Sequence, residues 1–323
     1  MQKRISIIAS RLANAGIEVV IVCNEGENVE GNPRTIRVSS LVEGFRLIRN
    51  IVSPSRKAVL YVARLIFPEH EHAELIESLS SENLLIVLRA QSTRAAELLS
   101  NDNIAKILAP RVSVVHVLNQ ESVSLLEGVY SNDQLKLLPN PFPLQLRGTW
   151  PRDNYAIFAG RIVPSKNLHS LLIAWTKLQP EHLRLRVYGV VYDESYYDYC
   201  RMISVGTKSI EWCAPYAPND LSAIARARFL VIPSFREGHS NLVTEAMSVG
   251  TFVLGSKIPG IAEHLRNGRG LCIPPTTAGL EDGLRSVVAM GDDELMHYTD
   301  LARAYALRHT NDLQVISLLG MLD

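Results

Sequence analysis

A strand–loop–helix–strand unit near the C-terminal end constrains the fold of this chain more than any other segment. The apolar run 228–232 (RFLVI) has the length and composition of a buried strand in a parallel sheet. A polar loop follows, and then a helix for which Ser240 or Asn241 is the expected N-cap. Gly250 should end this helix, and the next strand should begin within 251–256 (TFVLGS). Such a unit predicts a doubly wound α/β sheet, in which ligands bind outside the carboxyl ends of the strands.

The stretch 233–250, PSFREGHSNLVTEAMSVG, carries two carboxylates, Glu237 in the loop and Glu245 in the helix. Taken alone, two glutamates at this spacing are more often solvent-facing charges than a site. The surrounding pattern changes this balance, because the stretch resembles the donor-site signature of retaining, nucleotide-sugar-dependent glycosyltransferases of family 4, which have the two-domain GT-B fold. The matching elements, in order and in spacing, are Pro233-Ser234, Glu237-Gly238, Glu245-Ala246-Met247 and Gly250.

The resemblance implies a role for each part of this stretch. Glu237 would hold hydroxyls of the transferred sugar, and Glu245 would hold the ribose hydroxyls of the nucleotide. An ionised carboxylate suits both tasks, because it only accepts hydrogen bonds and can receive two hydroxyls at once. The backbone amides at the start of the helix would face the diphosphate. The implied substrate-binding residues are Gly160, Gly238, Ser240, Asn241, Leu242 and Glu245.

A second cluster lies upstream, in residues 154–178, which read as a strand, a loop and an amphipathic helix capped at Asn167. In family 4, an arginine that follows a glycine and a lysine at the start of the next helix hold the donor diphosphate. Arg161 and Lys166 match these positions, although alone they would be ordinary surface charges. Fixed cations aimed at a leaving diphosphate lower the barrier without a metal. Together with Glu237, they are the expected catalytic residues.

The alternation of strand-like and helix-like segments predicts two Rossmann-like doubly wound α/β domains, the GT-B arrangement. The expected domains are an acceptor-side domain, 1–147, and a nucleotide-sugar donor domain, 148–309. The proline-dense stretch 139–151 is the expected linker. The tail 310–323 is a weak amphipathic helix that either crosses back to the first domain or frays. The expected strands are 17–23, 57–63, 84–90, 113–118 and a short run at 136–140, then 155–159, 183–189, 210–213, 228–232, 251–256 and 271–273.

The N-terminus departs from the family pattern. Residues 1–16 read as a helix and strand 17–23 follows directly, whereas family 4 proteins place a strand and a glycine-rich loop before this helix. With the usual strand order 3-2-1-4-5-6, strand 1 lies in the middle of the sheet. Its absence would separate the 3-2 pair from the 4-5-6 set. We therefore expect a first domain that is incomplete at its N-terminus; the alternative is a native variant with a rearranged sheet.

A second departure concerns the first domain's own chemistry. Many family members have a histidine near the end of a first-domain strand, but the comparable strand here offers Arg89 and Gln91. His116 reads as a satisfied core residue rather than a catalyst. His70 and His72 lie two residues apart, so on a helix they point in different directions and indicate a solvated helix start rather than a metal site. The sequence therefore predicts no metal and no cofactor beyond the donor substrate.

Composition agrees with a cytoplasmic enzyme. The 323 residues suffice for two domains, and 33 basic residues balance 33 acidic ones, so no net charge attracts the chain to nucleic acid or to anionic lipid. No apolar run is long enough to span a membrane, and no signal peptide is evident; peripheral contact with the inner face of the membrane stays open. The four cysteines lack paired spacing and read as free thiols in a reducing compartment.

The sequence thus predicts a glycosyltransferase that moves a sugar from a nucleoside diphosphate sugar to a hydroxyl acceptor, with retention implied by the resemblance. Two alternatives remain: another GT-B enzyme, such as a nucleotide-sugar epimerase or a sugar phosphorylase, and a nucleotide-sugar-binding protein without transferase activity. A pyridoxal-type phosphorylase would need a much longer chain. Donor base, sugar, acceptor and oligomeric state cannot be read from the residues; 212–216 (WCAPY) is the candidate wall near the base.

Overall fold

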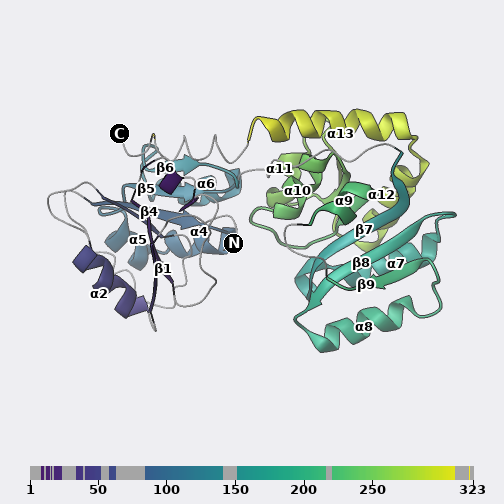
Figure 1. The fold of residues 1–323 in the computed structure, drawn as a ribbon, viewed down its shortest axis with the longest axis horizontal. Helices are drawn as coiled ribbons and strands as arrows, with labels where there is room; N and C mark the ends of the chain where they lie inside the picture. The colour runs from purple at the N-terminus through teal and green to yellow at the C-terminus, as the bar shows by residue number, and fades with distance from the viewer. Residues whose placement is uncertain are drawn as a thin grey trace. The chain divides into compact units, whose positions relative to one another are not determined.

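The chain divides into two compact units in a computed structural model; the described residues up to Asn140 form the first and those from Pro151 to His309 the second (Figure 1). The first part of the expected linker, at 139–140, is described, but its remainder up to residue 150 lies outside. The expected helix at 69–78, most of the helix at 1–16 and the tail at 310–323 also lie outside, apart from residue 320. The described residues are 9–10, 12–14, 16, 18–23, 34–38, 41–51, 58–62, 84–140, 151–215, 220–309 and 320.

The second unit contains a six-stranded parallel sheet in the order β12-β11-β10-β7-β8-β9. Numbered within the unit, this is the doubly wound order 3-2-1-4-5-6. β7 and β10 are neighbours although a long segment of chain separates them, so the switch point of the sheet lies between their carboxyl ends. The fold class is therefore α/β, as predicted. The strands are β7 (Asp153–Ile162), β8 (Arg184–Val191), β9 (Ile210–Cys213), β10 (Ala227–Ile232), β11 (Phe252–Ser256) and β12 (Leu271–Ile273).

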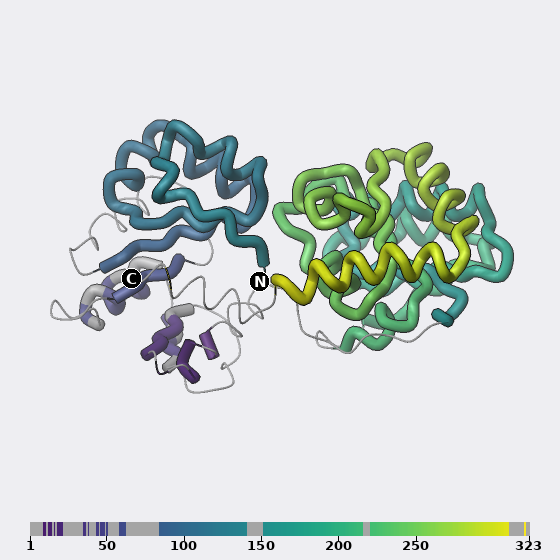
Figure 2. The backbone as a smooth tube through the Cα atoms, turned by 90° about the horizontal axis from the view of Figure 1, so that it is seen from above, coloured from purple at the N-terminus to yellow at the C-terminus, as the bar shows by residue number. Residues whose placement is uncertain are grey.

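Helices cover both faces of this sheet. One face packs against α7 (Leu168–Leu178), α8 (Glu194–Ser204) and α12 (Thr277–Ala289). The other packs against α9 (Ser222–Arg226), α10 (Asn241–Val249), α11 (Pro259–Leu265) and α13 (Asp292–Leu307). Figure 2 shows α13 as the long yellow helix, which packs against α10.

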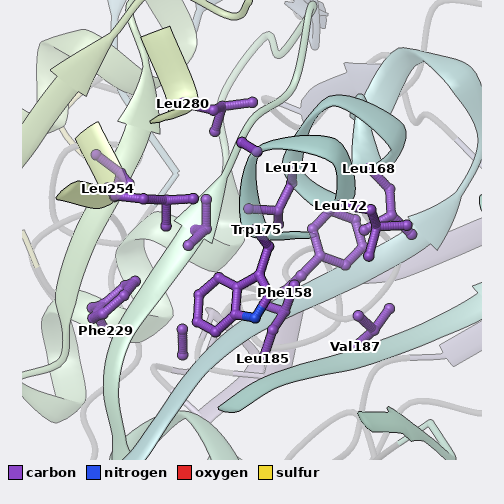
Figure 3. Packing of buried hydrophobic residues seen from close by; sticks show 14 of the residues in the cluster. Phe158, Leu168, Leu171, Leu172, Trp175, Leu185, Val187, Phe229, Leu254 and Leu280 are labelled. Atoms are coloured by element: carbon purple, nitrogen blue, oxygen red, sulfur yellow. The ribbon is translucent and has the colours of Figure 1, made fainter. Parts of the chain in front are cut away.

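The central strand β7 is buried on both faces, which explains its nearly continuous apolar sequence. Phe158 points into the core beneath α7, whereas Tyr155 and Ile157 point into the core beneath α10. Trp175 of α7 is fully buried beside Phe158 (Figure 3). Full burial of large apolar side chains contributes about 1.5–3 kcal/mol each. This packing anchors the strand that carries Gly160 and Arg161.

The first unit contains two separate parallel sheets within the described residues. One has four strands in chain order, β3-β4-β5-β6, and the other pairs β1 with β2. The two share no ladder in the described part of the chain. β1 pairs with β2, which was not predicted as a strand, and β3 pairs with β4 rather than with β1. The strands are β1 (Val20–Cys23), β2 (Arg34–Arg37), β3 (Ala58–Val62), β4 (Leu84–Ala90), β5 (Val114–Val117) and β6 (Leu135–Leu137). The helices are α2 (Leu41–Ile51), α4 (Thr93–Leu99), α5 (Asp102–Leu108) and α6 (Gln120–Leu126).

A buried polar network closes the carboxyl ends of β3 to β6. Tyr61 donates a 2.6 Å hydrogen bond to Nδ1 of His116, whose Nε2 lies 2.5 Å from the carbonyl oxygen of Leu138. Arg89 donates to Asn140 over 2.5 Å. Burial lowers the pKa of His116 to about 4; the Leu138 carbonyl raises it and Arg89 lowers it further. His116 is thus a satisfied core residue, as expected.

Within the described residues, no helix combines the length and the apolar character that crossing a bilayer requires.

Candidate functional site

The two clusters predicted from the sequence meet at the switch point between β7 and β10. The segment after β7 contacts the segment after β10 through a 3.0 Å hydrogen bond from the amide of Phe235 to the carbonyl of Ser165. The side chain of Asn167 adds a 2.9 Å bond to the carbonyl of Pro233. Two stretches that are far apart in the chain therefore form one pair of adjoining loops.

An ion pair joins the two loops at their centre. Nζ of Lys166 contacts Oε1 of Glu237. The same carboxylate oxygen accepts a 3.1 Å hydrogen bond from the hydroxyl of Ser234. The side chains are 19% exposed for Lys166 and 15% exposed for Glu237. A cation and an anion that were assigned to different parts of a ligand are thus in direct contact.

Asn167 holds the Lys166 loop in place. Its backbone is left-handed (φ 55, ψ 34), a region that asparagine tolerates better than most residues. It precedes α7 as predicted, but its side chain makes no helix-capping hydrogen bond. Its amide instead donates to the carbonyls of Pro233, at 2.9 Å, and Pro275, at 3.1 Å. The loops after β10 and β12 are thereby tied to the residue that follows Lys166.

Gly160 and Arg161 lie in the last part of β7, because this strand extends to Ile162 rather than ending before them as predicted. Gly160 has φ 150 and is paired with Gly189 of β8. A Cβ atom at Gly189 would lie 2.7 Å from the carbonyl oxygen of Gly160, so the two strands need glycine here. The guanidinium of the exposed Arg161 lies 5.5 Å from the ring centroid of Tyr192. No ion pair joins Arg161 to a carboxylate of the described residues.

The N-terminus of α10 faces the same loops. Ser240 occupies the N-cap position in an extended conformation, and its side chain makes no capping bond. Asn241 and Leu242 begin the helix and are half-buried, as is Glu245 one turn later. The first turn contains no acidic residue, so the positive end of the helix dipole is not offset there. Gly250 ends the helix in a left-handed conformation, as predicted.

Gly260, at the start of α11, supports the loop of Glu237 from behind. Its carbonyl accepts a 3.1 Å bond from the amide of Ser240. A Cβ atom at Gly260 would lie 2.2 Å from the carbonyl oxygen of Glu237 and 2.8 Å from the carbonyl carbon of Gly238. Helix α11 was not predicted from the sequence. The Pro259-Gly260 pair just after a buried strand is the signal that identifies such a helix start.

A pair of buried histidines packs behind the loop. His239 follows Gly238, and its ring centroid lies 4.4 Å from that of His264 in α11. Burial lowers the pKa of His264 to about 4, and the charges of Arg269 and His309 lower it further. A neutral ring at this place lets α11 pack closely against the loop.

The segment 212–216 is only partly described, because Tyr216 lies outside the described residues. Trp212 packs against α8: its ring centroid lies 5.3 Å from that of Tyr197, and the guanidinium of Arg201 lies 5.0 Å from it. Its indole N–H donates to Ser204 over 3.1 Å. The ring of Trp212 is therefore packed on α8.

No group of three or more histidine, cysteine, aspartate or glutamate side chains that could hold a metal ion occurs among the described residues. His70 and His72 lie outside them.

Comparison with known proteins identifies the second unit. Residues 153–289 match the family of glycosyl transferases group 1. No curated protein sequence matches the chain.

Solved structures match nearly the whole chain. A glycosyltransferase from Rickettsia africae has a TM-score of 0.81 at 14% identity, with 99% of this chain and 93% of that one covered. The Anabaena protein HepE, solved with UDP and glucose, has a TM-score of 0.76 at 13% identity, covering 99% and 94%. A sucrose-phosphate synthase from Thermosynechococcus elongatus has a TM-score of 0.76 at 15% identity, covering 97% and 90%. At these identities the likeness shows the fold, which is that of GT-B glycosyltransferases.

Proposed function

We propose that this chain, whose residues 153–289 form a glycosyl transferases group 1 domain, transfers a sugar from a nucleoside diphosphate sugar to a hydroxyl acceptor. The observation that carries this proposal is the meeting of Lys166 and Glu237 at the switch point of the second sheet. A cation and a hydroxyl-binding carboxylate are there side by side, at the edge where such sheets bind ligands. HepE, which has a similar fold, binds UDP and UDP-glucose.

Each part of the donor has a partner in this proposal. Arg161 and Lys166 hold the diphosphate, and so do the backbone amides at the start of α10, at Asn241 and Leu242. Glu245 takes the ribose hydroxyls. Glu237, in the loop with Gly238, takes hydroxyls of the sugar. Gly160 and Ser240 shape the walls of the donor site.

Transfer breaks the bond between the anomeric carbon and the diphosphate oxygen, which keeps the electron pair. The acceptor oxygen bonds to the anomeric carbon and releases its proton. We infer from the resemblance to family 4 that the anomeric configuration is retained. We also infer that no metal takes part, since Arg161 and Lys166 supply the positive charge that the leaving diphosphate needs. The chain contributes positioning and charge stabilisation rather than a nucleophile.

The first unit supplies the acceptor side in this proposal, and the reaction takes place in the cytoplasm. The free thiols of Cys200, Cys213 and Cys272 support a reducing compartment. Peripheral contact with the inner face of the membrane is compatible with a lipid or glycan acceptor.

The test uses UDP, GDP and ADP and their glucose or mannose esters. A ligand at 100 times its dissociation constant stabilises the folded protein by about 2.7 kcal/mol, so thermal shifts identify the base. Lys166→Ala should reduce this stabilisation to about half or less, since a ten-fold weaker complex is stabilised by about 1.4 kcal/mol at the same ligand concentration. Lys177→Ala should not, because Lys177 forms an exposed ion pair with Glu281 elsewhere on the unit. If none of the three diphosphates shifts the unfolding temperature, the proposal fails.

Turnover separates the remaining alternatives. A transferase releases the nucleoside diphosphate in proportion to an added hydroxyl acceptor, and the product carries the sugar. An epimerase would change the sugar while it stays on the nucleotide. Binding without either reaction would identify a nucleotide-sugar-binding protein.

A further inference from the structure

The contact between Lys166 and Glu237 places two donor-binding groups in competition. In the proposed function, Lys166 holds the diphosphate and Glu237 holds the sugar, yet the two side chains also contact each other. We propose that Glu237 competes with the diphosphate for Lys166 and thereby makes the site selective for the intact nucleotide sugar over the released nucleoside diphosphate. This inference rests on the proposed function and adds a specificity role for Glu237.

Charge and burial give the reason. The pair is largely shielded from water, with 19% and 15% of the two side chains exposed. A nucleoside diphosphate that draws Lys166 away leaves the Glu237 carboxylate with the hydroxyl of Ser234 as a donor and with a negative phosphate nearby. A half-buried carboxylate that loses its cation is destabilised, because few water molecules can replace the lost partner.

An intact donor compensates for this loss. Its sugar hydroxyls donate hydrogen bonds to Glu237, while its diphosphate accepts them from Lys166. Both ends of the broken ion pair then have new partners. After transfer the sugar leaves with the acceptor, Glu237 loses its donors, and the ion pair can form again. Re-formation of the pair weakens the hold on the product diphosphate and favours its release.

Arg161 provides an internal contrast. Its guanidinium contacts the ring of Tyr192, and no ion pair joins it to a carboxylate of the described residues. It can therefore bind a diphosphate without displacing an anion. The competition should be specific to Lys166.

The experiment measures dissociation constants by calorimetry for UDP and UDP-glucose. If GDP or ADP gives the larger thermal shift, that diphosphate and its sugar ester are used instead. Glu237→Gln removes the charge and keeps the size of the side chain. We expect it to tighten binding of the free diphosphate by about five-fold, the worth of an ion pair of about 1 kcal/mol. The same change should weaken binding of the intact sugar nucleotide. Glu281→Gln, which breaks the ion pair with Lys177, should alter neither constant.

A second background tests the route through Lys166. If Glu237 acts by competing for that cation, Glu237→Gln should leave diphosphate affinity nearly unchanged in a Lys166→Met protein. Equal tightening in both backgrounds would mean general repulsion by the carboxylate and would overturn the inference. Unchanged diphosphate affinity in the single variant would also overturn it, while the proposed function would stand. Absence of any diphosphate binding by the unaltered protein would instead reject the proposed function itself.

Discussion

Polar residues of similar types lie at the carboxyl ends of the two main sheets, but they differ in burial and in hydrogen-bond partners. In the first unit, Tyr61 donates a hydrogen bond to His116, and Arg89 donates one to Asn140. His116 and Arg89 are 1% and 4% exposed. In the second unit, Arg161 is exposed, and Lys166 and Glu237 are half-buried.

In the proposed function, this difference separates residues that stabilise the fold from residues that bind a ligand. A buried polar group must be hydrogen-bonded internally, and once bonded it helps to specify a unique core. A half-buried group such as Glu237, which both Lys166 and Ser234 contact, can exchange one of these partners for a ligand in that proposal. In the proposed function, polar residues at the carboxyl ends of a parallel sheet thus stabilise the first unit and bind the donor in the second.

The strongest test of this comparison is a matched pair of changes, one in each unit. Glu237→Gln should lower the transfer rate by about a hundred-fold, because a misoriented sugar loses its reactive geometry. Tyr61→Phe removes the hydroxyl that bonds His116 and should lower stability, but the folded protein should keep its transfer rate. Initial rates at saturating donor, with folding checked by circular dichroism, measure both. A larger loss of rate in Tyr61→Phe than in Glu237→Gln would reverse the comparison.

The next prediction concerns the support behind the loop. Gly260→Ala places a Cβ atom against the backbone of Glu237, so the loop must shift, and transfer should fall by about ten-fold or more. Gly291→Ala is the matched control, because nothing lies within 4 Å of its added Cβ. Equal rates for the two variants would show that the position of the Glu237 backbone does not matter for transfer.

A smaller effect is expected for the cations. Arg161→Ala or Lys166→Ala should weaken binding of the nucleoside diphosphate by about ten-fold or more, since hydrogen bonds to charged groups contribute roughly 1.5–3 kcal/mol. Binding of the uncharged nucleoside should change little, because the lost partner is phosphate. Calorimetric titration with both ligands separates these cases; an equal loss for nucleoside and diphosphate would indicate a folding defect instead.

Much of the second unit could be predicted from the sequence. The limits of β9 and β12 were predicted correctly, although both strands are short and mostly half-buried. In the first unit the limits of β4 were predicted correctly, whereas β2 was not predicted as a strand. β2 reads RTIR, a short segment whose pairing with β1 comes from tertiary structure rather than composition.

The site could be predicted only as far as its motif extends. The motif predicts Glu237, Arg161 and Lys166 as site residues, but it does not predict the contact between Lys166 and Glu237. Neither the ion pair between Lys166 and Glu237 nor the close approach of Gly260 has a local signal in the sequence. The ion pair depends on β10 lying beside β7, and the close approach depends on β11 lying beside β10. Asn167 was interpreted as a helix cap because asparagine favours that position; its bonds to two distant carbonyls come from the fold.

The smallest predicted effect is on stability in mild acid, where the two units should behave alike. Burial lowers the pKa of His116 in the first unit and of His264 in the second to about 4. The unfolded chain, with a histidine pKa near 6.5, binds more protons than the folded one between pH 6.5 and 4, so stability falls as the pH drops through this window. Each histidine should account for about 1 kcal/mol of lost stability at pH 6 relative to pH 7.5.

Urea denaturation of the parent and of His264→Phe and His116→Phe at both pH values measures this loss. Each variant should lose about 1 kcal/mol less on acidification than the parent. If His116→Phe lost as much stability on acidification as the parent, His116 would take up a proton in the folded state. The buried network of the first unit would then not be closed to exchange, and the comparison with the second unit would fail.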